Sequence, residues 1–219
     1  MKLSWLIHKK HKHLLLIFNG WGFDEHAWVD LHAPAQTDVL LISDYTTLDN
    51  ADTLQYTEDY VAVSVLAWSF GVYAAQLCSR HIHHARHCVA VNGTLHPVHD
   101  TFGIPAAVFN ATLSGYNDTS RDKFMQRVAG SAAALQARIQ ALPRRSTASQ
   151  LAELQALAGY FHQPPPAQGL HWRQAIVARR DRIFPPANMH AAWQRQGVVV
   201  SGIDSGHWPD FNAIVRQLP

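Results

Sequence analysis

Cysteine, charge and long apolar runs are all scarce in this sequence. Only two cysteines occur in 219 residues, which excludes the disulfide framework of a small secreted domain. Charged residues make up 16% of the chain and the formal net charge is +2, far from the strongly basic balance of a dedicated nucleic-acid-binding domain. No run reaches the roughly 18 consecutive apolar residues that span a bilayer. We therefore expect neither a nucleic-acid partner nor a membrane segment.

A secretory signal does not fit the N-terminal pattern either. The apolar run at residues 14–18 is too short for the apolar core of a signal peptide, and no cleavage site of the A-x-A kind follows it. The glycosylation sequons at Asn92, Asn110 and Asn117 are therefore interpreted as chance matches. These features predict a cytoplasmic location.

Short apolar runs, by contrast, are frequent. The chain is 47% hydrophobic, enough for the core of one globular domain. Runs that are rich in β-branched residues and show little polar alternation are typical of strands covered on both faces. Segments 69–82 and 186–196, between such runs, are compatible with helices. The alternation predicts an α/β fold with a mostly parallel sheet and helices on both faces. The predicted strands are residues 13–18, 38–43, 60–67, 87–92, 174–179 and 197–202.

The alternation stops between residues 104 and 168. This block has no strong strand run, and its segments 122–142 and 147–161 have helical composition. Pro143 and the "QPPPAQG" stretch punctuate it. We predict a single domain in which a helical lid, residues 104–168, is inserted between the core segments 1–103 and 169–219.

The hexapeptide "LAWSFG" at residues 66–71 contains a candidate nucleophile, Ser69. In a nucleophile elbow, the serine occupies a strained turn between a strand and a helix, and the residues two before and two after it are small. Gly71 meets this requirement, and Ala67 stands where a first glycine is usual. The alternative interpretation is a serine that only caps the following helix.

Two partners for Ser69 stand at suitable chain positions. His207 follows the last predicted strand and is a candidate general base. Asp181 ends the previous strand and is a candidate to orient the imidazole. The order Ser, Asp, His is that of α/β-hydrolases. The alternatives are that Asp181 is a turn residue paired with Arg179, Arg180 or Arg182, and that Asp204 or Asp210 supplies the acid.

Acyl transfer also needs hydrogen-bond donors aimed at the developing oxyanion. The main-chain N–H of Phe70, directly after Ser69, is one candidate. The turn Gly20-Trp21-Gly22, directly after the first predicted strand, offers the N–H of Trp21 as the second. The alternative is an ordinary glycine-rich turn.

Four segments, "LLLIFNGWG", "AWSFGVYAA", "RRDRIFPP" and "DSGHWPDF", resemble the BioG-type pimeloyl-acyl carrier protein methyl ester esterases, and more distantly the BioH esterases. The resemblance implies an α/β-hydrolase of biotin synthesis that needs no cofactor and releases methanol from the carrier-bound ester. It implies Ser69 as nucleophile, His207 as base and Asp181 as its partner, with Trp21 and Phe70 donating to the oxyanion. Asn19, where related hydrolases often have histidine, and Ala67 depart from the pattern.

The resemblance gives the helical block an expected role, because carrier proteins are acidic. The block has six basic and three acidic residues, a balance of +3. Such a patch mainly speeds encounter and sets orientation. The alternatives are ordinary helix-surface arginines and apolar lid core. The expected carrier-binding residues are Arg121, Lys123, Arg127, Arg138, Arg144 and Arg145, and the expected acyl-channel residues are Trp21, Leu113, Phe124 and Tyr160.

Histidines cluster at residues 8–13 and 81–87, but no carboxylate or cysteine stands near them at a ligand spacing, so we expect no metal site. Two other functions stay open at this point. One is a general carboxylesterase or thioesterase for small acyl substrates, and the other is a catalytically inactive hydrolase-fold binding protein. A dehalogenase is disfavoured, because it needs an acidic nucleophile where Ser69 stands.

Overall fold

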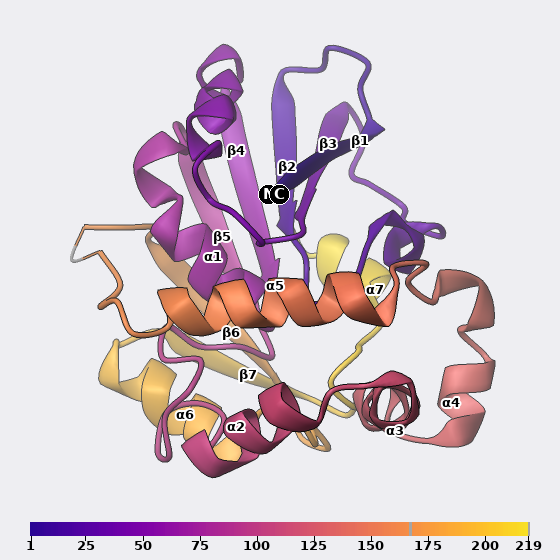
Figure 1. Cartoon of the computed structure of the whole chain (residues 1–219). Coiled ribbons are helices and arrows are strands. Elements are labelled where there is room, and N and C mark those ends of the chain that lie inside the picture. Colours follow the sequence, from indigo (N-terminus) through magenta and orange to yellow (C-terminus); the bar gives the residue numbers. More distant parts are fainter. Residues whose placement is uncertain (167, 219) are drawn as a thin grey trace.

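The computed structural model describes residues 1–166 and 168–218 and contains a seven-stranded sheet in the order β1-β3-β2-β4-β5-β6-β7 (Figure 1). Residues 167 and 219, which fall inside the predicted segments 104–168 and 169–219, lie outside the described residues. None of the described helices is long and apolar enough to cross a membrane. The strands are β1 (Lys2–Ile7), β2 (His13–Phe18), β3 (Thr37–Ser43), β4 (Ala62–Trp68), β5 (Ala85–Val91), β6 (Trp172–Ala178) and β7 (Val199–Ile203).

The six predicted strands are all present and pair in parallel. Strand β1 was not predicted; it runs antiparallel to β3 at the edge of the sheet. Its residues are half-buried or exposed throughout, so it lacks the continuous apolar run that marks the other strands.

The sheet has an apolar core on each face, as its uninterrupted apolar strands require. One core contains residues of α1 (Gly71–Leu77), α5 (Thr147–Tyr160) and α6 (Pro186–Arg195). The other contains residues of α3 (Asp118–Ala129) and α7 (Phe211–Val215). The predicted mostly parallel sheet with helices on both faces is therefore confirmed. The helix expected over 69–82 is shorter, because α1 ends at Leu77 and a separate 3-10 turn follows at Ser79–His81.

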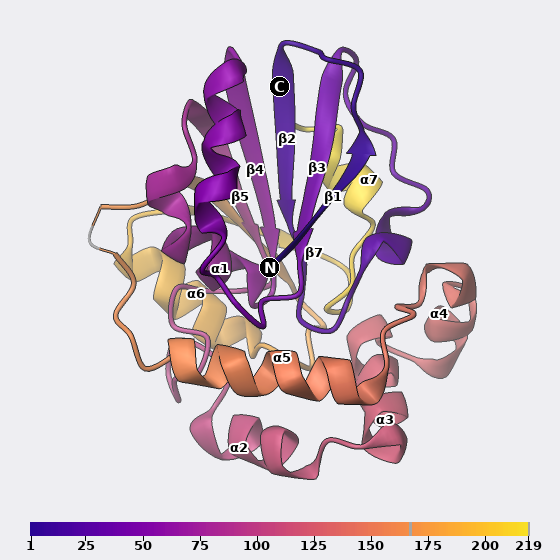
Figure 2. The same cartoon turned by 45° about the horizontal axis from the view of Figure 1, so that its top comes forward.

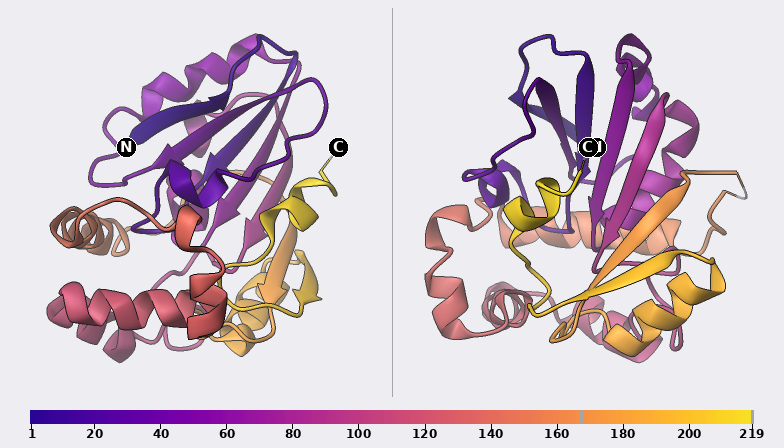
Figure 3. Two further views of the ribbon diagram at one scale, coloured as in Figure 1. Left: turned by 90° about the vertical axis from the view of Figure 1, so that its right-hand side faces the viewer. Right: turned by 180° about the vertical axis from the view of Figure 1, so that it is seen from behind.

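Among the described residues, four α-helices lie between β5 and β6 in the chain: α2 (Ala106–Gly115), α3, α4 (Ala132–Gln136) and α5, with a 3-10 turn at Ile139–Ala141. The segment 122–142 is not one helix, since Gly130 ends α3 in a left-handed conformation with φ of 94° and Ser131 caps α4. Figures 1 and 2 show these helices grouped beyond the carboxyl ends of the central strands. The side view shows that they cover this end of the sheet and leave the opposite end free (Figure 3).

Candidate active site

Ser69 lies on the sharp turn between β4 and α1, in the left-handed region with φ of 60°. A non-glycine residue held there costs about 1–3 kcal/mol, a strain that clusters at functional sites. Close packing keeps the turn in place. A Cβ atom added at Gly71 would lie 2.4 Å from the carbonyl oxygens of Phe18 and Asn19, and one at Gly93 would lie 2.2 Å from that of Ser69. The local geometry is that of a nucleophile elbow, and glycine is required on its helical side.

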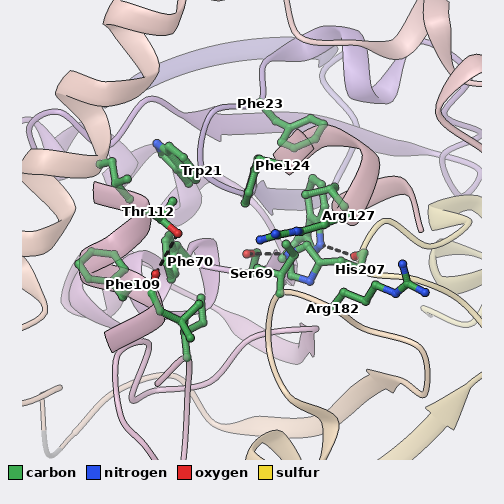
Figure 4. Close-up of a pocket in the computed structure, with 17 residues that line it drawn as sticks. Trp21, Phe23, Ser69, Phe70, Phe109, Thr112, Phe124, Arg127, Arg182 and His207 are labelled. Atoms are coloured by element: carbon green, nitrogen blue, oxygen red, sulfur yellow. Dashed lines mark hydrogen bonds between the residues drawn. The ribbon is translucent and has the colours of Figure 1, made fainter. Parts of the chain in front are cut away.

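The three residues predicted to act together are brought together. His207 Nε2 lies 3.0 Å from Ser69 Oγ (Figure 4). His207 Nδ1 lies 2.7 Å from Asp181 Oδ2. All three side chains are buried. The other carboxylate oxygen of Asp181 accepts hydrogen bonds from the main-chain N–H groups of Ile183 and Phe184, at 2.7 and 3.0 Å. These bonds fix the carboxylate so that one oxygen faces the imidazole.

The competing acids have other partners. Asp204 pairs with Arg180 at the surface, at 3.1 Å, and Asp210 caps α7 by accepting from the N–H of Asn212 at 2.9 Å. Asp181 bonds to His207 and to main-chain N–H groups, which makes it the carboxylate positioned against the imidazole.

The loop that carries His207 is anchored by residues the sequence did not mark. The carbonyl of His207 accepts hydrogen bonds from Trp68 Nε1 and from Asn92 Nδ2, each at 2.9 Å. Asn92 Oδ1 accepts from the N–H of Ala178 at 2.7 Å. The ring of Phe184 stacks on the imidazole, with centroids 6.1 Å apart. One signal was available: Asn92 is a polar residue that directly follows a buried strand, at the edge where Ser69 lies.

The two expected oxyanion donors both line the cavity at Ser69. Within residues 1–166 and 168–218, no protein acceptor bonds the main-chain N–H of Trp21 or of Phe70. Asn19, which stands where histidine is common in related hydrolases, is buried, and its Oδ1 accepts from the N–H of Gly20 and from Trp28 Nε1, each at 3.1 Å. These hydrogen bonds hold the loop in place, so asparagine at this position, instead of the histidine common in related hydrolases, still supports the loop.

The cavity beside Ser69 is apolar, with two arginines among its lining residues (Figure 4). Trp21 and Phe124 line it, as expected. Leu113 and Tyr160 do not: Leu113 packs against the core, and the Tyr160 hydroxyl accepts from the N–H of Leu48 at 3.2 Å. Helix α2 turns other residues inward. The residues that sequence reasoning missed here include Ile104, Val108, Phe109, Thr112, Leu154 and Arg182.

Three of the six expected carrier-binding residues have internal partners instead. Arg145 is mostly buried and pairs with Glu153 and Asp44, and Arg121 donates to the carbonyls of Pro143 and Arg145. Arg138 donates to the carbonyl of Pro209 and lies over the Trp208 ring, 4.9 Å from its centroid. Charge counting treated them as surface residues, but their guanidinium groups join segments of the fold. The exposed residues of the set are Lys123, Arg127 and Arg144.

Comparisons with known proteins show the family to which the chain belongs. The family described as "Pimeloyl-ACP methyl esterase BioG" matches residues 1–214. A malonyl-[acyl-carrier protein] O-methyltransferase of Bacteroides fragilis is 36% identical over 200 residues, which are 91% of this chain but only 40% of that protein. The crystal structure of BioG from Haemophilus influenzae is 33% identical, with a TM-score of 0.83 over 95% of this chain and 94% of that one.

More distant structures share the fold alone. An esterase from Exiguobacterium antarcticum is 13% identical, with a TM-score of 0.65 over 94% of this chain and 87% of that one. A bromoperoxidase from Bacillus anthracis is 15% identical, with a TM-score of 0.64 over 98% and 94%. The sheet order and these neighbours give an α/β-hydrolase fold, and within that fold the chain belongs to the BioG family.

Proposed function

We propose that this protein is a serine esterase that hydrolyses the methyl ester of pimeloyl-acyl carrier protein, releasing methanol, in biotin biosynthesis. The observation that carries the proposal is the hydrogen-bonded series Ser69, His207 and Asp181 on a strained elbow, in a chain of the BioG family. The reaction needs no cofactor. Because the substrate is bound to a carrier protein of cytoplasmic biosynthesis, we place the enzyme in the cytoplasm.

In the first half of the proposed reaction, Ser69 Oγ attacks the ester carbonyl carbon while His207 Nε2 takes the hydroxyl proton. Asp181 accepts the hydrogen bond from Nδ1–H and stabilises the imidazolium. The N–H groups of Trp21 and Phe70, which have no protein acceptor among the described residues, donate to the oxyanion. When the tetrahedral intermediate collapses, the bond between the carbonyl carbon and the methoxy oxygen breaks, and the imidazolium gives its proton to that oxygen. Methanol departs, and the acyl group stays bonded to Ser69 Oγ.

In the second half, a water molecule attacks the acyl-enzyme carbonyl and gives a proton to His207 Nε2. The intermediate breaks its bond to Ser69 Oγ, which takes the proton back from the imidazolium. The product is the carrier-bound acid with a free terminal carboxylate. A neutral methyl ester suits the apolar cavity, whereas the ionised product is poorly solvated there, which favours its release.

The surroundings of the cavity support an acyl group linked to a carrier. An outer groove between α2 and α3 shares four lining residues with the inner cavity: Val108, Thr112, Phe124 and Arg127. The inner cavity is mostly apolar, and the groove adds Lys123 and Ser120. We propose that the acyl chain occupies the cavity, that the polar arm passes along the groove, and that the acidic carrier docks near Lys123, Arg127 and Arg144. The helices between residues 104 and 168 then act as a lid.

The relative from Bacteroides fragilis supports the choice of substrate class. Its name assigns it methylation of a carrier-bound malonyl group, and a region similar to this chain makes up 40% of it. A protein that forms a carrier-bound methyl ester thus contains a segment resembling a proposed methyl esterase. We infer that this chain acts on the same class of compound.

A direct comparison of substrates tests the proposal. The methyl ester of pimeloyl-carrier protein and the same ester on a small pantetheine thiol are offered to the enzyme at equal concentration. The proposal predicts methanol release from both, with a lower KM for the carrier form. Equal KM values favour a general carboxylesterase, and release of the free thiol with the methyl ester retained favours a thioesterase. Unchanged hydrolysis by a Ser69→Ala variant favours a protein whose hydrolase site is inactive.

A further inference from the structure

We propose that Glu153 and Gln150 of helix α5 are positioning residues that aim the Trp21 N–H at the oxyanion. The inference rests on the proposed function, because it assigns a role within the same site. Neither residue lines the cavity where the substrate reacts. They act through the loop Gly20-Trp21-Gly22.

Glu153 binds the loop through its carboxylate. Its side chain is fully buried, and its Oε2 accepts a hydrogen bond from the N–H of Gly22 at 3.1 Å. Oε1 accepts from the N–H of Tyr45 at 2.9 Å, and the Tyr45 hydroxyl donates to the carbonyl of Asn19 at 2.8 Å. Arg145 pairs with the same carboxylate. One buried side chain therefore fixes the chain on both sides of Trp21.

Gln150 binds the carbonyl group of Gly22, the residue whose N–H is bound by Glu153. Its Nε2 donates to the carbonyl of Gly22 at 2.8 Å, and its Oε1 accepts from the Tyr116 hydroxyl at 2.9 Å. The main-chain carbonyl of Gln150 accepts from the indole Nε1 of Trp21 at 2.7 Å. Residues 150 and 153 are one turn apart and lie on one face of α5. This face holds both main-chain polar groups of Gly22 and the indole of Trp21.

These contacts determine the direction of the Trp21 N–H. The Gly22 N–H belongs to the peptide unit that follows Trp21, so fixing it together with the indole restricts the rotation of the Trp21 backbone. Gly22 has φ of 79°, and a Cβ atom there would lie 3.2 Å from Gln150 Nε2, so the loop approaches α5 closely. Loss of one oxyanion donor costs about 10²–10³ in kcat, and a misaimed donor costs part of that.

A positioning role is distinguishable from support of the fold. A hydrophobic residue of similar volume often replaces a buried ion pair without loss of stability. Here, however, the carboxylate accepts hydrogen bonds from two main-chain N–H groups, one of them in the loop that contributes to the site. A role in the oxyanion site changes transition-state binding, whereas a role in stability alone changes only unfolding.

The test uses Glu153→Gln and Tyr116→Phe, with the surface change Glu25→Gln as the matched control. In Glu153→Gln an NH₂ group replaces one of the two carboxylate oxygens. It faces either the N–H of Gly22 or the N–H of Tyr45, so one of these two hydrogen bonds is lost. Tyr116→Phe removes only the hydroxyl that orients Gln150. Glu25 pairs with Lys2 at the surface, and its side chain makes no hydrogen bond to the loop Gly20-Trp21-Gly22 within the described residues. The readouts are kcat, KM, urea unfolding and the affinity for a trifluoromethyl ketone, which forms a tetrahedral adduct with an active-site serine.

Glu153→Gln should lower kcat and trifluoromethyl ketone affinity together by about 10-fold to 100-fold, with KM changed less than about twofold. Tyr116→Phe should lower both by about threefold to tenfold, and Glu25→Gln should change neither. Unchanged ketone affinity in folded Glu153→Gln overturns the proposal. If that variant does not fold, unchanged ketone affinity in Tyr116→Phe overturns it. Failure of the proposed function looks different, because the wild-type protein then leaves the carrier-bound ester intact, while the ketone still reports on the loop.

Discussion

The side-chain amide of Asn92 donates to the main-chain carbonyl of His207 at 2.9 Å, across 115 residues of sequence. The same side chain accepts from the N–H of Ala178, so it joins the ends of β5 and β6 to the loop after β7. Asn92 is buried and left-handed, with φ of 48°. The position of the imidazole therefore depends on a residue that has no contact with the reacting atoms.

An Asn92→Asp substitution tests this dependence, because the two side chains have the same shape and both tolerate a left-handed conformation. An ionised carboxylate cannot donate to the His207 carbonyl and repels it, so we expect kcat to fall by about 10-fold to 100-fold, corresponding to about 1.4–2.7 kcal/mol.

Protonation restores a donor to the Asn92→Asp side chain. The ratio of variant to wild-type kcat should therefore rise as the pH falls, measured from pH 8 to the lowest pH at which the wild type stays active. A ratio that is independent of pH, or an unchanged kcat, would show that this amide does not hold the histidine loop.

The nucleophile elbow should not tolerate a side chain at Gly71. Gly71→Ala places a methyl group 2.4 Å from two carbonyl oxygens, so we expect loss of esterase activity and a lower melting temperature. Gly159→Ala, in α5, is the matched control, since nothing lies within 4 Å of its added Cβ and Gly159 lines neither the inner cavity nor the outer groove. We expect that variant to keep full activity and to gain up to about 1 kcal/mol in stability, because alanine favours the helix. Equal thermal denaturation curves for the two variants would contradict the close packing at the elbow.

Charge at the exposed basic residues should affect only the carrier-bound substrate. Lys123→Glu combined with Arg144→Glu should raise KM for the methyl pimeloyl carrier by about threefold to tenfold at low salt, and the effect should shrink as salt screens the attraction. KM for the same ester on a short thiol that lacks the polar arm should not change. Arg86→Glu combined with Arg216→Glu, at two exposed residues outside the helical block, is the control for the same change in net charge. An equal rise in KM for both substrates would show that these residues do not dock the carrier protein.

The two cysteines should be silent in the folded protein. Burial raises the pKa of Cys78 and of Cys88 to about 12, so both are neutral thiols at pH 8. We expect iodoacetamide to label neither one in the native protein and to leave activity unchanged, whereas both react after unfolding in urea. Loss of activity together with labelling of one native cysteine would argue for a thiol in the reaction. Mass spectrometry of the labelled protein measures the outcome.

The sequence predicted the proposed reacting side chains because each follows an apolar run. The carboxyl ends of neighbouring parallel strands meet at one edge of the sheet, so Ser69, Asp181 and His207 had to lie near one another. Strand β1 escaped prediction because its exposed edge carries no such run. Glu153 escaped for another reason: its main-chain partners are distant in the sequence, and no local pattern marks them. The position of Asn92 directly after a buried strand was a signal, but no local pattern showed that its partner is the distant His207 carbonyl.

The basic residues illustrate a further limit. Counting charges shows an excess of basic residues in the helical block, but burial decides which guanidinium groups face outward. Arg145 was taken up by Glu153 and Asp44, whereas Arg144 beside it is exposed. Adjacent residues in a turn between helices can point in different directions, so the structure is needed to tell which of them is exposed.

The most direct test follows the mass of the methyl pimeloyl carrier during incubation with wild-type protein and with the Ser69→Ala variant. The account predicts that wild type removes the mass of one CH₂ group from the carrier-bound acyl chain, that methanol appears in equal amount, and that Ser69→Ala does neither. An unchanged carrier mass with the wild-type protein, or the same loss with Ser69→Ala, would contradict it.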